Sequence, residues 1–173
     1  PSSADKLIKV IGGEATSEET QGKDTDQNPL TLKMSYDGNK KTYFNSAFGQ
    51  VSYPFSIRYE LEKGHTLNSI VYTPRTDSGN KWGSFDQFTV EVSTADKPDD
   101  FVKIGDYARG NGVHTPFTIK LSKPVEDAKF VRFIINKAYE DRVSCAEMEF
   151  YEASSNKFDP ATIFADNMGL QLK

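Results

Sequence analysis

The sequence predicts an all-β fold, built as an antiparallel β-sandwich or jelly roll. Apolar and polar residues alternate over several segments, as they do in strands that turn one face to the core and the other to water. Aromatic residues, which favour strands, make up 12% of the 173 residues. Between Ser35 and Glu152 no segment has the apolar spacing of an amphipathic helix of three turns.

The expected strands follow one another between turns rich in Gly, Pro, Asn and Asp. The clearest is 55–62, in which every odd position is apolar and every even position is polar. Further strands are expected at residues 67–72, 88–92, 101–107, 117–121, 129–135 and 145–151. Most aromatic rings fall on alternating strand positions and are expected in the core, among them Phe55, Tyr59, Phe88, Phe117, Phe133 and Phe150.

Two flanking segments have a different composition. Residues 12–30 are polar and rich in Gly, Thr and acidic side chains, so we expect a loop there with one short turn. After Glu152 the sequence changes to that of a linker, ASSNK. We therefore expect one domain at 1–152, followed at 153–173 by a linker and the start of a downstream region.

Composition and motifs disfavour several functions. The net charge of −4 disfavours a nucleic-acid partner, and a single Cys excludes an internal disulfide and a structural zinc site. His65 and His114 lie beside turns, outside any known catalytic motif, and Cys145 is expected to be a small hydrophobic residue of a strand. No stretch has the roughly 18 apolar residues that a membrane span needs. We therefore expect a binding module and not an enzyme.

Several short motifs resemble one family. The segment 36–46, YDGNKKTYFNS, resembles the DG-x-x-x-T-x-W segment of the discoidin family, the coagulation factor V/VIII type C domains. Segments 59–64, 72–75, 85–93, 130–133 and 145–150 resemble its later motifs in the same order, so that the likeness extends over about residues 6–152. The likeness is to the bacterial branch, the family 32 carbohydrate-binding modules. It implies a discoidin-like jelly roll of about eight core strands.

The resemblance also implies a structural Ca²⁺ ion near one end of the sandwich. The positions that match its ligands are Asp37, Asn39, Thr42, Ala146 and Glu147. Ca²⁺ takes six to eight oxygen ligands, and a Gly-containing turn beside carboxylates can supply them. The alternative is that residues 37–39, DGN, form an ordinary turn.

The same resemblance places a glycan site on loops at one end of the sandwich. The positions that match it are Asn45, Phe48, Arg75, Asp77, Asn80, Trp82 and Tyr139. An aromatic ring would stack on the sugar, and an Arg would hydrogen-bond neighbouring hydroxyls. Alternatively, Arg75 braces a carboxylate within its loop, and Trp82 and Phe48 are half-buried packing residues. The chain has Asn45 where many relatives have His and Phe48 where they often have Trp.

The C-terminal residues 158–173 resemble the lead-in to enhancin-like zinc metallopeptidases of gut bacteria, which act on mucin glycoproteins. On this resemblance we expect an extracellular or cell-surface bacterial module, monomeric, that directs an attached enzyme to glycans. The expected ligand is of the galactose or N-acetylgalactosamine type or another host glycan. Two alternatives stay open. One is a discoidin-type domain that binds protein or lipid, although the net charge disfavours membranes. The other is a spacer that packs on the downstream domain.

Overall fold

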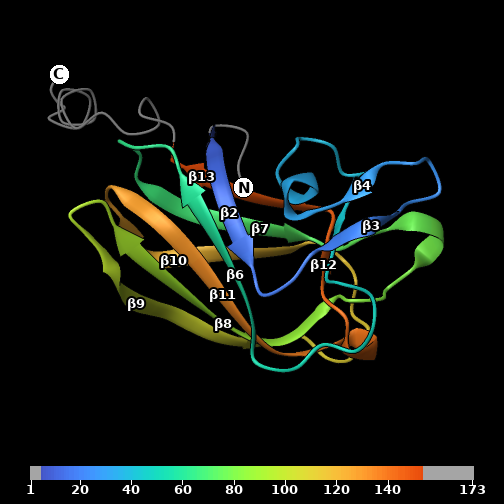
Figure 1. Ribbon diagram of the computed structural model, residues 1–173. Coiled ribbons are helices and arrows are strands. Elements are labelled where there is room, and N and C mark those ends of the chain that lie inside the picture. Colours follow the sequence, from blue (N-terminus) through green and yellow to red (C-terminus); the bar gives the residue numbers. More distant parts are fainter. Residues whose placement is uncertain (1–4, 154–173) are drawn as a thin grey trace, which may run out of the picture.

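The computed structural model describes residues 5–153, and they form a β-sandwich of two antiparallel sheets (Figure 1). One sheet has the order β1-β13-β7-β10, with strands Lys6–Ile8, Glu147–Glu152, Leu67–Thr73 and Phe117–Val125. The other has the order β2-β6-β11-β8-β9, with strands Val10–Ala15, Phe55–Leu61, Ala128–Ala138, Phe85–Thr94 and Lys97–Ala108. The predicted fold class is therefore confirmed. The expected region 154–173 lies outside the described residues.

Alternation along the strands builds the core, as predicted. In β6 the four odd positions are buried and the even positions between them are partly exposed. Tyr59 of β6 joins the two sheets, because its ring lies 6.0 Å from that of Phe133 in its own sheet and 5.5 Å from that of Phe150 in the other. Five of the six predicted core rings are buried; Phe117 is partly buried and packs against them.

The expectation of a loop at residues 12–30 is wrong. Part of β2 lies there and pairs with β6, and β3 (Glu19–Lys23) and β4 (Pro29–Leu30) form a small hairpin. No side chain of β2 is fully buried, so the strand shows no apolar alternation. Its pairing instead needs close backbone approach, since a Cβ on Gly13 would lie 3.0 Å from the carbonyl oxygen of Arg58.

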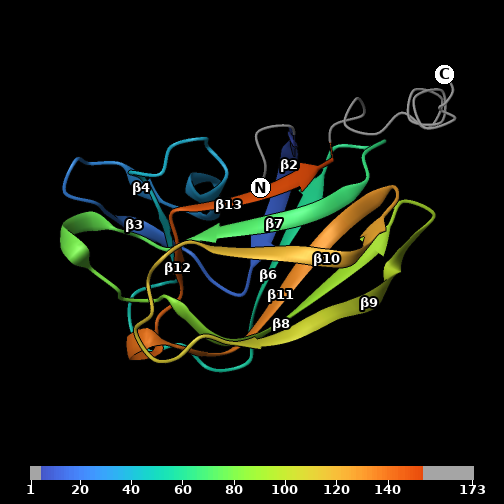
Figure 2. The same cartoon turned by 180° about the vertical axis from the view of Figure 1, so that it is seen from behind.

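Several connections gather at one end of the sandwich, opposite the turns that join β8 to β9 and β10 to β11 (Figure 2). Here lie the β3–β4 hairpin, the two-stranded sheet of β5 (Phe44–Asn45) and β12 (Ser144–Cys145), and two 3₁₀ turns, η2 (Asp77–Gly79) and η3 (Tyr139–Asp141). A third turn, η1 (Leu32–Ser35), precedes β5. Strand β1 pairs with β13, so the two ends of the described chain lie side by side. Among residues 5–153, no helix is long and apolar enough to cross a membrane.

Candidate functional site

The gathered connections enclose a pocket of about 410 Å³. It is lined by Lys23, Leu30, Tyr43, Asn45, Phe48, Arg75, Trp82 and Arg142. Four of the seven residues that the sequence predicted for a glycan site are among them: Asn45, Phe48, Arg75 and Trp82. The pocket is thus assembled from the β3–β4 hairpin, β5, the loop after β7 and the turn η3.

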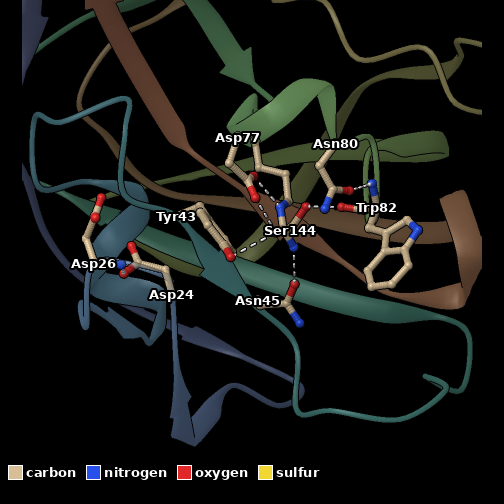
Figure 3. Close-up of polar contacts among 9 residues, drawn as sticks. Asp24, Asp26, Tyr43, Asn45, Asp77, Asn80, Trp82 and Ser144 are labelled. Atoms are coloured by element: carbon tan, nitrogen blue, oxygen red, sulfur yellow. Dashed lines mark hydrogen bonds and ion pairs between the residues drawn. The ribbon is translucent and has the colours of Figure 1, made fainter.

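Arg75 is hydrogen-bonded to three neighbouring side chains, those of Asp77, Tyr43 and Asn45, which Figure 3 labels. Its Nε and Nη2 donate to the two carboxylate oxygens of Asp77, both at 2.7 Å, which is the bidentate geometry of a strong ion pair. Nη2 also donates to the hydroxyl of Tyr43 at 2.8 Å, and Nη1 lies 3.4 Å from Oδ1 of Asn45. The side chain is buried. Most of its donors are therefore engaged within the loop, so Arg75 braces the wall of the pocket as well as lining it.

Trp82 is fixed at its backbone while its ring is left exposed. The backbone N–H of Trp82 donates to Oδ1 of Asn80 at 2.7 Å, and its carbonyl accepts from the hydroxyl of Ser144 at 2.6 Å (Figure 3). Gly83 follows with φ of +83°, and a Cβ there would collide with Ser144. The Trp82 ring remains 46% exposed, and the guanidinium of Arg142 lies 4.6 Å from its centre. The loop therefore presents an aromatic face at a fixed place.

Phe48 is a second exposed aromatic residue that lines the pocket, and it is 61% exposed. Its ring packs on Gly22 of the β3–β4 hairpin, where a Cβ would collide with it. The two segments are tied by Glu19, whose carboxylate accepts from the backbone N–H groups of Phe48 at 2.9 Å and Gly22 at 2.7 Å. These hydrogen bonds hold the pKa of Glu19 below its ordinary value.

The other three predicted glycan-site residues lie beside the pocket. Asp77 and Asn80 support Arg75 and Trp82 from behind, as described above. Tyr139 is not among the lining residues; its ring lies 5.6 Å from Nζ of Lys81.

Sequence reasoning missed four lining residues: Lys23, Leu30, Tyr43 and Arg142. Tyr43 had a usable signal, because it lies two positions before Asn45 and so on the same face of an extended segment. Lys23 and Leu30 had none, since they reach the pocket only through the unexpected hairpin.

A larger cavity, of about 590 Å³, lies between the edge strands β9 and β10. It reaches Thr94, at the opposite end of β8 from Phe85 and the glycan-site loops. None of the described residues that line it is aromatic, so it offers no ring on which a sugar could stack. We therefore take the smaller pocket as the candidate site.

The predicted calcium ligands converge at the start of β13. Glu147 is buried; its Oε2 accepts from the backbone N–H of Gly38 at 2.9 Å, and its Oε1 has no hydrogen-bond partner among the described residues. Burial first, and then repulsion from Asp37, raise the pKa of Glu147 to about 8. Such a carboxylate is stabilised by a nearby cation.

The remaining predicted ligands surround these two carboxylates. The hydroxyl of Thr42 donates to Oδ2 of Asp37 at 2.5 Å and lies 3.1 Å from the carbonyl oxygen of Asn39. Ala146 precedes Glu147 and is buried. Within residues 5–153, no group of three or more His, Cys, Asp or Glu is arranged so that it could hold a metal ion, so most ligands of an ion here would be backbone and hydroxyl oxygens. Those oxygens and the unpaired Oε1 fit the hard-oxygen preference of Ca²⁺.

His65 and Cys145, which were considered as catalytic candidates, lie in surroundings that favour a structural role. His65 lies between Glu152, at 2.6 Å, and Glu62, at 3.0 Å, and these carboxylates raise its pKa. Cys145 is fully buried, and burial raises the pKa of its thiol well above the ordinary value. A thiol in that state is a poor nucleophile.

Comparison with solved structures identifies similar chains. A family 32 carbohydrate-binding module of Clostridium perfringens, in complex with GalNAc-β-1,3-galactose, is 25% identical and has a TM-score of 0.66; the match covers 80% of this chain and 93% of that one. The family 32 module of C. perfringens NanJ, in complex with galactose, is 21% identical with a TM-score of 0.68, over 84% and 99% of the two chains. A C. perfringens ZmpB structure with CBM32-1, CBM32-2 and M60 catalytic domains is 20% identical with a TM-score of 0.69, over 85% of this chain and 15% of that one.

No curated protein matches the chain. The model of the F5/8 type C domain family, however, matches residues 14–149, which is most of the chain. This match confirms the resemblance seen in the sequence, and with it the expectation of a domain that is not itself an enzyme. The chain belongs to the F5/8 type C, or discoidin, domain family.

Proposed function

We propose that this domain is a carbohydrate-binding module whose glycan site is the pocket around Arg75 and Trp82. The observation that carries the proposal is the exposed Trp82 ring, fixed at its backbone by Asn80 and Ser144 and set in a pocket with polar side chains. Aromatic faces of this kind stack on the apolar C–H face of a pyranose, while polar groups fix its orientation. The similar C. perfringens modules in complex with galactose and with GalNAc-β-1,3-galactose support a ligand of this type.

The roles divide among the lining residues. Trp82 and Phe48 supply the stacking surface, since both residues line the pocket and are exposed to solvent. Asn45 is buried, and its side-chain amide donates to the carbonyl oxygen of Ser46 at 2.8 Å. Its Oδ1 faces Arg75, so Asn45 mainly supports that residue. A shallow site with one or two rings and solvent-competed hydrogen bonds gives weak binding, with Kd of roughly 0.1 to several millimolar.

We propose that Asp37, Asn39, Thr42, Ala146 and Glu147 hold a structural Ca²⁺ ion. The unpaired buried oxygen of Glu147 supports this proposal. The ion would tie β13 to the loop that leads into β5, and so would fix the position of the strand that carries Asn45.

We also propose that the module works outside the bacterial cell and directs an attached enzyme to host or dietary glycans. The ZmpB structure, in which modules of this kind accompany an M60 catalytic domain, supports this arrangement. A mucin-directed metallopeptidase is the proposed partner domain.

A mucin-glycan array followed by calorimetric titration tests the site. We expect Trp82→Ala to abolish binding and to change the melting temperature little, because the ring is exposed. Phe101→Ala, which removes a partly buried ring from β9 beside Arg132, is the matched control and should bind normally. Binding that survives Trp82→Ala would refute the assignment of the site, and an array without any hit would refute glycan binding.

A further inference from the structure

The charged side chains that line the glycan pocket are all cations: Lys23, Arg75 and Arg142. This contrasts with the chain as a whole, whose net charge is −4. Arg75 is neutralised by Asp77, as described above. Among residues 5–153, no carboxylate forms an ion pair with Lys23 or Arg142. Two positive charges that have no carboxylate partner within the described residues therefore line one small pocket.

Two acidic side chains of the β3–β4 hairpin, Glu19 and Asp24, are engaged within that hairpin and the loop beside it. The carboxylate of Glu19 accepts three backbone N–H groups. That of Asp24 accepts the backbone N–H of Asp26 (Figure 3). It also accepts the backbone N–H and the side-chain amide of Asn28. These acids lower the local positive potential, but none of them is among the lining residues and their oxygens have partners. Lys23 and Arg142 therefore supply the charged donors that no described carboxylate engages.

Arg142 is well placed to use its donors. Its guanidinium lies over the Trp82 ring, 4.6 Å from the ring centre, and no hydrogen bond joins it to another side chain in the part of the chain that the structure describes. A guanidinium that lies over an aromatic ring has N–H groups at its edge that are free to donate. A sugar that packs against Trp82 therefore lies beside a planar fork of donors that matches a carboxylate or a sulfate.

We propose that the pocket selects an anionic sugar, one that carries a carboxylate or a sulfate group, with Arg142 and Lys23 as the residues that contact the anion. The inference rests on the proposed glycan site and names its ligand class. A neutral sugar can occupy the same place, but it leaves both cations without a counter-charge. Because the site is open to water, the preference is moderate, about tenfold in Kd, which corresponds to about 1.4 kcal/mol.

Matched sugar pairs test the proposal. Galactose is compared with galacturonic acid and with galactose 6-sulfate, by calorimetric titration of the chain at low and at raised salt. We expect both anionic sugars to bind about tenfold more tightly than galactose, with the preference shrinking as salt rises. Galacturonic acid and galactose 6-sulfate are both used because together they show whether the pocket prefers a carboxylate or a sulfate.

Three charge-removing variants complete the experiment. Arg142→Gln and Lys23→Gln should each bring the ratio of the two affinities toward one. Lys120→Gln removes the same charge from an exposed position on β10, and it should leave the ratio unchanged. Thermal melting checks that each variant is folded.

The outcomes separate this inference from the function on which it rests. Equal affinity for neutral and anionic sugars, or a preference that survives both substitutions in the pocket, overturns the anion selectivity and leaves the glycan site standing. Absence of binding to all three sugars and to the mucin-glycan array overturns the glycan site and this inference with it.

Discussion

Glu147→Gln is predicted to stabilise the domain when calcium is absent and to lose this advantage over the wild type when calcium is bound. Without metal, the folded chain raises the pKa of Glu147 from 4.5 to about 8. A carboxyl whose pKa is raised on folding gives its full stability at low pH and loses it as the pH rises, here between about 4.5 and 8. At pH 7 the loss in the free energy of unfolding is about 3 kcal/mol, because pH 7 lies about 2.5 units above the ordinary pKa and each unit contributes about 1.36 kcal/mol.

Glutamine removes this cost, because it is neutral and can still accept the N–H of Gly38. In EDTA at pH 7 the variant should therefore melt roughly 6 to 12 °C above the wild type, at about 2 to 4 °C for each kcal/mol. At pH 5 the advantage should fall below about 1 kcal/mol. With Ca²⁺ at about 100 times its Kd the wild type gains about 2.7 kcal/mol, whereas the variant gains little.

Differential scanning calorimetry in EDTA and in CaCl₂, at both pH values, measures these shifts. Glu126→Gln removes a carboxylate from an exposed turn and is the control for charge alone. A wild-type melting temperature indifferent to EDTA and Ca²⁺ would rule out the calcium site. A variant that responds to Ca²⁺ as strongly as the wild type would show that Glu147 is not a ligand.

Two further changes probe the scaffold. Arg75→Ala should weaken glycan binding and also lower the melting temperature, because it leaves Asp77 without its ion pair; binding lost with unchanged stability would instead give Arg75 a purely ligand-contacting role. His65 should stabilise the fold at low pH: its pKa is raised by Glu62 and Glu152, so its contribution is complete below about 6.5 and disappears as the pH rises through the folded value. Urea denaturation against pH should show this decline in the wild type but not in His65→Gln.

The sandwich itself could be predicted from local pattern. A strand such as β6 buries alternate side chains, so its sequence carries a period-two signal, and Tyr59 falls on the buried face. Strand β2 carries no such signal, because it contributes backbone pairing at a sheet edge while its side chains stay largely exposed.

The site was predicted in part for a related reason. Trp82 and Arg75 stand out in the sequence as residue types suited to sugars, and both line the pocket. The positive charge of the pocket was missed. Lys23 lies on a hairpin that was not expected, and Arg142 lies after a turn, 60 residues beyond Trp82 in the chain. Proximity between residues that are far apart in the sequence depends on tertiary structure, which alternation within one segment does not encode.

The fluorescence of Trp82 tests the central claim most directly, because Trp82 is the one tryptophan of the chain and it lines the proposed glycan pocket. Titration with GalNAc-β-1,3-galactose, galacturonic acid or galactose 6-sulfate should give a saturable change in emission, with a midpoint between about 0.1 and several millimolar. Glucitol, an open-chain polyol, should give none. Emission that stays constant with every sugar, while the array reports binding, would place the ligand elsewhere and contradict this account of the site.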